Sequence, residues 1–177
     1  MILSEQQKFM LAAIQRLGCV RRDQLVALFR PAFCAASPGA EEGVVDSALY
    51  RLRCCCQQVR VSNGVWRMSN AKENGKLLEA VDVMIELSGA KPLDYQKAQP
   101  PALLRFTVQE QKIRRFVVAA YGEDPADLRL GPYDRVILLF DGRGQAQPLA
   151  VSNKQFFAVR QKNGTHRYFA GGHEGGT

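Results

Sequence analysis

The chain has 177 residues, of which 46% are hydrophobic and 23% charged, a composition ordinary for a soluble globular protein. No apolar run approaches the ~18 residues that a membrane span needs, and the chain starts without the basic and apolar regions of a signal peptide, so we expect a cytoplasmic protein with no membrane contact. The formal net charge is +7, and residues 1–70 hold nine basic against five acidic side chains. This surplus favours phosphate-rich partners such as nucleic acids.

The five cysteines follow neither a disulfide nor a zinc pattern. Their number is odd, three of them are consecutive at 54–56, and the two histidines lie far along the chain near its end. We therefore expect small buried hydrophobic side chains in a reduced compartment, with no metal ion and no cofactor. Cys54 is the exception, because adjacent helical residues cannot all face inward, and a redox role for its exposed thiol stays open.

Residues 4–33 predict two helices with a short extended piece between them. Ser4-Glu-Gln-Gln7 has the form of a capping box, and the helix that it begins should end at Gly18. Cys19-Val20 is extended, and Asp23 precedes a second amphipathic helix that we expect Pro31 to end. A small-residue loop then fills the rest of 31–40.

A third helix is predicted from Glu41 to about Cys55, because two glutamates suit the positive end of the helix dipole. Apolar side chains at helical spacing form its inward stripe: Val45, Ala48, Leu49, Leu52 and Cys56. Polar and charged side chains take the solvent face: Asp46, Ser47, Tyr50, Arg51, Arg53 and Cys54. These side-chain types can reach DNA.

The next segment, 59–68, alternates about Asn63-Gly64, the strongest short-range hairpin signal that a sequence offers. A two-residue turn there would pair Val61 with Trp66 on one face and Arg60 with Arg67 on the other. Like charges directly opposite each other destabilise a sheet, so this pair of arginines suggests a surface that binds an anion such as a nucleic-acid backbone.

The order of helix, strand, two helices and a hairpin over residues 4–69 resembles the winged helix-turn-helix. In that family the third helix enters the major groove of double-stranded DNA while the hairpin, the wing, contacts the backbone. Helix N-termini also favour anions, so Arg21 and Arg22, next to the start of the second helix, could bind another phosphate. The side chains that this resemblance implies as DNA contacts are Arg21, Arg22, Ser47, Tyr50, Arg51, Arg53, Arg60 and Arg67.

Two features depart from the family. The 31–40 loop is longer than the tight turn of the simple helix-turn-helix, and Glu41, Glu42 and Asp46 would repel phosphates from the third helix. A winged fold that serves only protein contacts is therefore an alternative.

The second half, 71–170, predicts a linking helix followed by a small sheet, and 171–177 a flexible tail. Asn70 should cap the helix and Gly89 end it, and its apolar stripe could dock on the first domain, pack on the sheet or form a dimer. The stripe consists of Leu77, Leu78, Val81, Met84, Ile85 and Ser88.

Three further segments indicate the strands of that sheet. Segments 103–108 and 113–119 read as an antiparallel pair, and 135–140, which lacks alternation, as a central strand buried on both faces. A second Asn-Gly hairpin at Asn163-Gly164 would place Arg160 opposite Arg167. The expected fold class is α+β, with an N-terminal winged helix (1–70), a linking helix and a mainly antiparallel sheet.

One constellation resembles a catalytic site. Asp94, Glu110 and Lys112 loosely imitate the Asp and Glu-x-Lys set with which restriction-type nucleases hold Mg²⁺ and support the attacking water. These residues fall in expected loops, whereas the family's carboxylates project from core strands. We therefore expect a non-enzymatic protein, with a Mg²⁺-dependent nuclease and a protein-interaction adaptor as alternatives.

The order of elements over the whole chain also resembles small winged-helix proteins of Gram-positive plasmids and conjugative elements, including the replication-relaxation type. This resemblance implies DNA binding in the control of replication, transfer or transcription. It also implies that 71–170 is a nuclease-like fold without catalytic residues, available for a homodimer or a protein partner.

Overall fold

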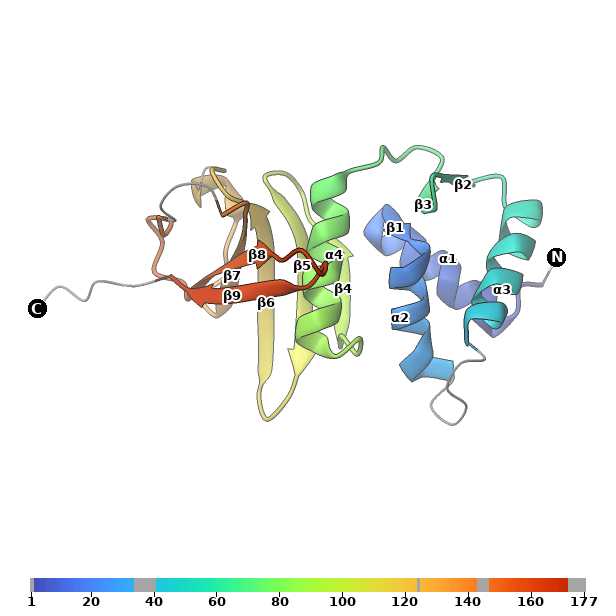
Figure 1. Cartoon of the computed structure of the whole chain (residues 1–177), viewed down its shortest axis with the longest axis horizontal. Helices are drawn as coiled ribbons and strands as arrows, with labels where there is room; N and C mark the ends of the chain where they lie inside the picture. Colours follow the sequence, from blue (N-terminus) through green and yellow to red (C-terminus); the bar gives the residue numbers. More distant parts are fainter. Residues whose placement is uncertain (1, 34–40, 124, 143–146, 172–177) are drawn as a thin grey trace, which may run out of the picture.

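The computed structural model describes residues 2–33, 41–123, 125–142 and 147–171, which form an α+β fold with four α-helices and two sheets (Figure 1). The N-terminal part contains α1 (Glu5–Leu17), β1 (Cys19–Arg21), α2 (Arg22–Phe33), α3 (Glu41–Cys55), β2 (Val59–Ser62) and β3 (Val65–Met68). The rest contains α4 (Gly75–Ser88), β4 (Asp94–Lys97), β5 (Ala102–Gln109), β6 (Ile113–Ala120), the 3-10 helix η1 (Pro125–Leu128), β7 (Asp134–Phe140), β8 (Gln155–Arg160) and β9 (His166–Ala170).

The first helices begin where the sequence predicts, but α2 is longer. The capping box of α1 is formed in both directions, and Gly18, with φ +77°, ends the helix. The prediction that Pro31 ends α2 is wrong, because the helix continues to Phe33. Pro31 lies in the last turn, where it removes only one backbone hydrogen bond, and Phe33 stacks on Phe29 with ring centroids 4.6 Å apart.

The β2–β3 hairpin has the predicted register. Arg60 lies opposite Arg67 and Val61 opposite Trp66, and the turn residues Asn63 and Gly64 have φ of 50° and 76°. Such left-handed conformations are what a two-residue hairpin turn requires. The strand β1 adds to the outer side of β3, so that a three-stranded sheet, β1-β3-β2, covers one end of the helices.

The linking helix α4 begins later than predicted. Asn74, not Asn70, is its N-cap and accepts a hydrogen bond from the backbone N–H of Leu77 at 3.0 Å, while Gly89 ends it as predicted in the left-handed conformation. Asn70 lies in the turn that follows β3, where the N–H of Ala71 donates to the carbonyl of Met68 at 2.9 Å. Residues 69–74 therefore separate the hairpin from the helix.

α4 lies between the two halves of the molecule (Figure 1). It contacts α2 and β1 on one side and β5, β6 and β7 on the other, so both predicted docking surfaces are used at once. Nearly its whole circumference is therefore buried, including Leu77, Leu78, Ala80, Val81, Val83 and Met84. The apolar stripe that could have formed a dimer is covered within this chain. None of the helices in the described parts is long and apolar enough to cross a membrane.

The six-stranded sheet has the order β4-β5-β6-β7-β8-β9. The predicted β5–β6 pair is antiparallel and β7 is central and buried on both faces, as expected. The β6–β7 and β7–β8 pairs are parallel and the other three pairs are antiparallel, so the sheet is mixed, with two parallel pairs that the sequence does not predict. Leu128, Leu130 and Leu149, from the two connections between these parallel strands, pack against the face opposite α4 and form a second core there.

The register predicted for the second hairpin is wrong by one residue. Arg160 lies opposite His166, and Arg167 lies opposite Val159. The turn is longer than two residues: the N–H of Gly164 (φ +88°) donates to the carbonyl of Gln161, and the N–H of Gln161 donates to the carbonyl of Thr165. A turn closed by a glycine bulge shifts the strands by one position, so no arginine pair forms here.

The main core is continuous. One cluster of buried hydrophobic side chains extends from α1, α2 and α3 through α4 to the near face of the sheet. Packing against α4 therefore sets the orientation of the N-terminal helices. The division of the chain near residue 70 stays a prediction.

Candidate nucleic-acid interface

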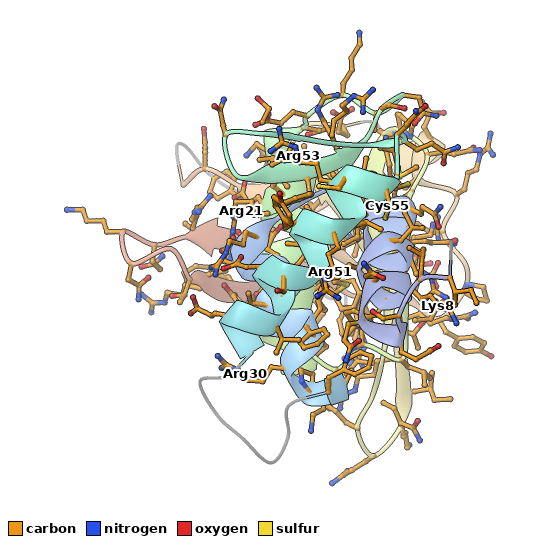
Figure 2. All side chains as sticks on the ribbon, turned by 90° about the vertical axis from the view of Figure 1, so that its right-hand side faces the viewer. Lys8, Arg21, Arg30, Arg51, Arg53 and Cys55 are labelled. Atoms are coloured by element: carbon orange, nitrogen blue, oxygen red, sulfur yellow. The ribbon has the colours of Figure 1, made fainter. Side chains whose placement is uncertain are left out.

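The outward face of α3 forms one end of the molecule and faces the viewer in Figure 2. Val45, Leu49 and Leu52 are buried against α1 and α2, as the inward stripe predicts. The side chains predicted to face solvent are all exposed: Asp46, Ser47, Tyr50, Arg51, Arg53 and Cys54. Tyr50 is 69% exposed, so its ring and hydroxyl are open to solvent on this face.

The acidic end of α3 is partly neutralised within the protein, because one arginine binds two of its carboxylates. The guanidinium group of Arg22 donates to both carboxylate oxygens of Asp46, at 2.7 and 2.8 Å, and to Glu42 at 3.1 Å. The hydrogen bonds from Arg22 hold the pKa of Asp46 below its usual value. Arg22, predicted to bind phosphate, is therefore occupied by carboxylates, and two of the three acidic residues expected to repel phosphate share its one positive charge.

Arg21 serves the contact between the halves of the molecule. Its guanidinium group donates to Asp23 at 3.0 and 3.1 Å and to Asp82 of α4 at 2.6 Å. Gln24 donates from its side-chain amide to the same oxygen of Asp82 at 2.7 Å and to the carbonyl of Leu78 at 2.7 Å. The structure thus places Arg21, also predicted to bind phosphate, in a partly buried network that holds β1 and α2 on α4.

The paired arginines of the hairpin interact with backbone carbonyls. Arg60 donates to the carbonyl oxygens of Gln57 and Val59 at 2.8 and 3.3 Å, and Arg67 donates to that of Ala71 at 2.8 Å. The two guanidinium groups therefore bind different parts of the chain, which relieves the like-charge contact expected of directly opposite arginines. A carbonyl carries no net charge, so these contacts leave the positive charge of both side chains uncompensated.

Within residues 1–70, α3 and the hairpin carry four arginines that have no carboxylate partner among the described residues. Arg51 and Arg53 make no hydrogen bond or ion pair with any residue that the structure describes, and Arg60 and Arg67 bind only carbonyls there. The carboxylates of 1–70 whose side chains are described all have basic partners: Glu5 with Lys8, Asp23 with Arg21, and Glu42 and Asp46 with Arg22. In Figure 2, Arg53 lies at the end of α3 next to the hairpin, and Arg51 lies on the side next to α1.

A shallow groove of about 380 Å³ runs between the start of α1 and α3. Ser47 and Arg51 line it together with Gly43, Val44 and Ala48 of α3 and Ser4, Gln6 and Gln7 at the start of α1. Gln6 was not among the residues that the sequence predicts for the interface. A helical pattern can show that Gln6 avoids the core, but only the packing of α1 on α3 shows which residues stand beside it.

The two nuclease-like carboxylates are each paired with an arginine. Asp94 of β4 accepts from Arg16 at 3.3 Å, and Glu110, in the β5–β6 turn, pairs with Arg114 at 2.8 Å. Over the described ranges, no group of three or more His, Cys, Asp or Glu side chains is placed to hold a metal ion. Nothing in this geometry supports Mg²⁺-dependent cleavage.

Among the cysteines, Cys54 is exposed as predicted, and Cys55, the last residue of α3, and Cys56, which follows the helix, are partly buried. Cys19 is buried, and burial raises the pKa of its thiol. Cys34 lies outside the described residues.

Comparison with known proteins identifies no relative. No family model, no curated protein and no solved structure matches this chain.

Proposed function

We propose that this protein binds double-stranded DNA and does not cleave it, with residues 4–69 acting as a winged helix. In this proposal α3 lies in the major groove, where Ser47, Tyr50, Arg51 and Arg53 contact base edges and phosphates, and the β2–β3 hairpin is the wing. The remainder of the chain holds this module in place and serves self-association or a protein partner. From the resemblance to winged-helix proteins of plasmids and conjugative elements, we further propose that this binding controls replication, transfer or transcription on a mobile element.

One observation carries the proposal: the separation of charge within the N-terminal part. Four arginines without a carboxylate partner among the described residues, Arg51, Arg53, Arg60 and Arg67, lie on two adjacent elements. The nearby acidic side chains Glu42 and Asp46 are paired with Arg22 instead. A surface that keeps several guanidinium groups free of carboxylates suits a polyanion, because phosphates can then bind without displacing an internal ion pair.

The arrangement also distinguishes two kinds of contact. Arg60 and Arg67 lie on a hairpin whose backbone is fixed by the β1-β3-β2 sheet, which suits sequence-independent contacts to phosphates. Ser47 and Tyr50 lie on the exposed face of α3 and carry groups that donate and accept hydrogen bonds, which suits base edges. Arg21 and Arg22 are not included, because their carboxylate partners occupy them.

The proposal is tested by fluorescence polarisation of a labelled duplex of mixed sequence, titrated with the full chain between about 50 and 200 mM salt. The variants are Arg51→Ala/Arg53→Ala and Arg60→Ala. The matched control is Arg160→Ala, which removes another exposed arginine, on β8 and outside the proposed interface. Each variant changes an exposed side chain, and circular dichroism checks that it is folded.

For the wild-type chain, log K should fall linearly with the logarithm of the salt concentration. Each phosphate contact removed should reduce the magnitude of this slope by about 0.9. Arg160→Ala should keep the wild-type slope. Absence of duplex binding at the lowest salt would refute the proposal and favour the protein-interaction adaptor. An equal loss in Arg160→Ala would show that net charge alone, and not this surface, binds DNA.

A further inference from the structure

A partly buried group of ionisable side chains, with His166 at its buried centre, joins β9, the last strand of the sheet, to α4. The imidazole of His166 has no exposed surface, and its Nδ1 lies 3.0 Å from a carboxylate oxygen of Glu86. The other carboxylate oxygen of Glu86 accepts from the backbone N–H of His166 at 3.2 Å and from the hydroxyl of Tyr168 at 2.7 Å. On the opposite side of the ring, Nε2 lies 3.6 Å from Glu79, two turns earlier on α4.

This geometry suits an imidazolium ion. A neutral imidazole carries one N–H, so one of its two nitrogens would present a lone pair to a carboxylate in a buried site. A protonated ring presents an N–H to both Glu79 and Glu86. Buried charges are tolerated when they are paired in this way. A ring nitrogen that carries no proton and faces a carboxylate is unfavourable.

The charges around His166 balance only when it is protonated. Lys76 of α4 pairs with Glu79 at 3.1 Å, and Tyr168 of β9 remains neutral because burial and then its hydrogen bond to Glu86 raise the pKa of its hydroxyl. Lys76 and the imidazolium ion thus offset the carboxylates Glu79 and Glu86.

Two further charged groups approach this cluster from neighbouring elements. Asp82, between the two glutamates on α4, is paired with Arg21 of β1. Arg160, opposite His166 on β8, is exposed. Burial by itself would lower the pKa of His166, but the carboxylates of Glu79, 3.6 Å from Nε2, and Glu86, which hydrogen-bonds Nδ1, outweigh burial and raise the pKa above its usual value.

We propose that the proton on His166 holds β9 on α4, and that loss of this proton releases the strand. β9 is the outer strand of the sheet, and the N–H of His166 that Glu86 now accepts would become free to pair with another strand. The device goes beyond the proposed DNA binding, because it lies at the edge of the sheet and involves none of the arginines of α3 and the hairpin.

The test is hydrogen–deuterium exchange of the full chain between about pH 6 and 9, with each rate divided by the intrinsic rate of the unstructured peptide at that pH. The amides of β9 report the release of the strand, and those of β5, within the same sheet, serve as the internal reference. The variants are His166→Gln, which keeps an amide donor but cannot be charged, and His173→Gln, the same change at the chain's other histidine.

A raised pKa makes the stabilisation complete below about pH 6.5 and removes it as the pH rises through the folded-state pKa. The opening constant of β9 should therefore increase by up to about tenfold per pH unit within that window and then level off, while the corrected exchange of β5 stays constant. His166→Gln should open β9 equally at all pH values, and His173→Gln should behave as wild type.

Two results would overturn the proposal. One is a corrected exchange rate of β9 in the wild-type chain that does not depend on pH. The other is a pH dependence that persists unchanged in His166→Gln, since another group would then be responsible. The first result is measured on the wild-type and His173→Gln chains, which both keep His166. The proposal therefore remains testable even where His166→Gln fails to fold.

Discussion

The ion pair between Arg21 and Asp82 should contribute more to stability than any exposed pair at the same boundary. Asp82 lies on α4 with its side chain 13% exposed, and one of its oxygens accepts from Arg21 at 2.6 Å and from Gln24 at 2.7 Å. Asp82→Ala removes the acceptor of both hydrogen bonds. Arg21 would keep its bond to Asp23, and Gln24 would keep its bond to a backbone carbonyl.

The expected cost can be worked out from these contacts. A hydrogen bond to a charged group contributes about 1.5–3 kcal/mol, and the remaining partners of Arg21 and Gln24 recover part of the two that are lost. We therefore expect Asp82→Ala to lower the free energy of unfolding by about 2–3 kcal/mol. Asp82→Asn, which keeps an acceptor oxygen but not the charge, should cost about 1 kcal/mol.

The matched control is Asp94→Ala. Its pair with Arg16 also joins the N-terminal part to the sheet side, but the distance is 3.3 Å and the two side chains are 66% and 53% exposed. Exposed pairs contribute little, so this variant should cost less than about 1 kcal/mol. Urea denaturation followed by circular dichroism and by the fluorescence of Trp66, the chain's one tryptophan, measures both. Equal losses in the two alanine variants would refute the reasoning that burial of Asp82 sets the difference.

Backbone geometry and charge give two more predictions. Gly64→Ala forces a side chain into φ +76° and should cost about 1 kcal/mol in urea denaturation. Gly75→Ala, at the start of α4 with no atom within 4 Å of the added carbon, should be neutral or stabilising, and equal effects would contradict the turn assignment. The nearby His166 ring and Lys76 lower the pKa of Glu79, so the stabilisation from its carboxylate is complete above about pH 4.5 and is lost as the pH falls further. The stability difference between the wild type and Glu79→Gln should therefore shrink below pH 4.5, and a constant difference in pH-dependent urea denaturation would contradict this.

Where the structure agrees with the sequence in detail, the determining forces are local. The capping box at Ser4, the left-handed turn at Asn63-Gly64 and the glycine that ends α4 each involve residues within a few positions of one another. Within β7, residues 136–140 are all apolar. This run predicts a strand buried on both faces, because it has no polar side chain for a solvated face. The helix order, the first hairpin register and the exposed face of α3 all depend on such short-range patterns.

The tertiary structure decided what depends on distant partners. Arg21 and Arg22 look like phosphate-binding residues in the sequence, yet carboxylates that lie 61 and 24 positions later occupy them. The second hairpin has the same Asn-Gly signal as the first, but a longer turn shifts its register and places His166 against α4. A sequence pattern determines which side chains leave the core. Only the packing of α4 between the two halves determines which charges are paired there.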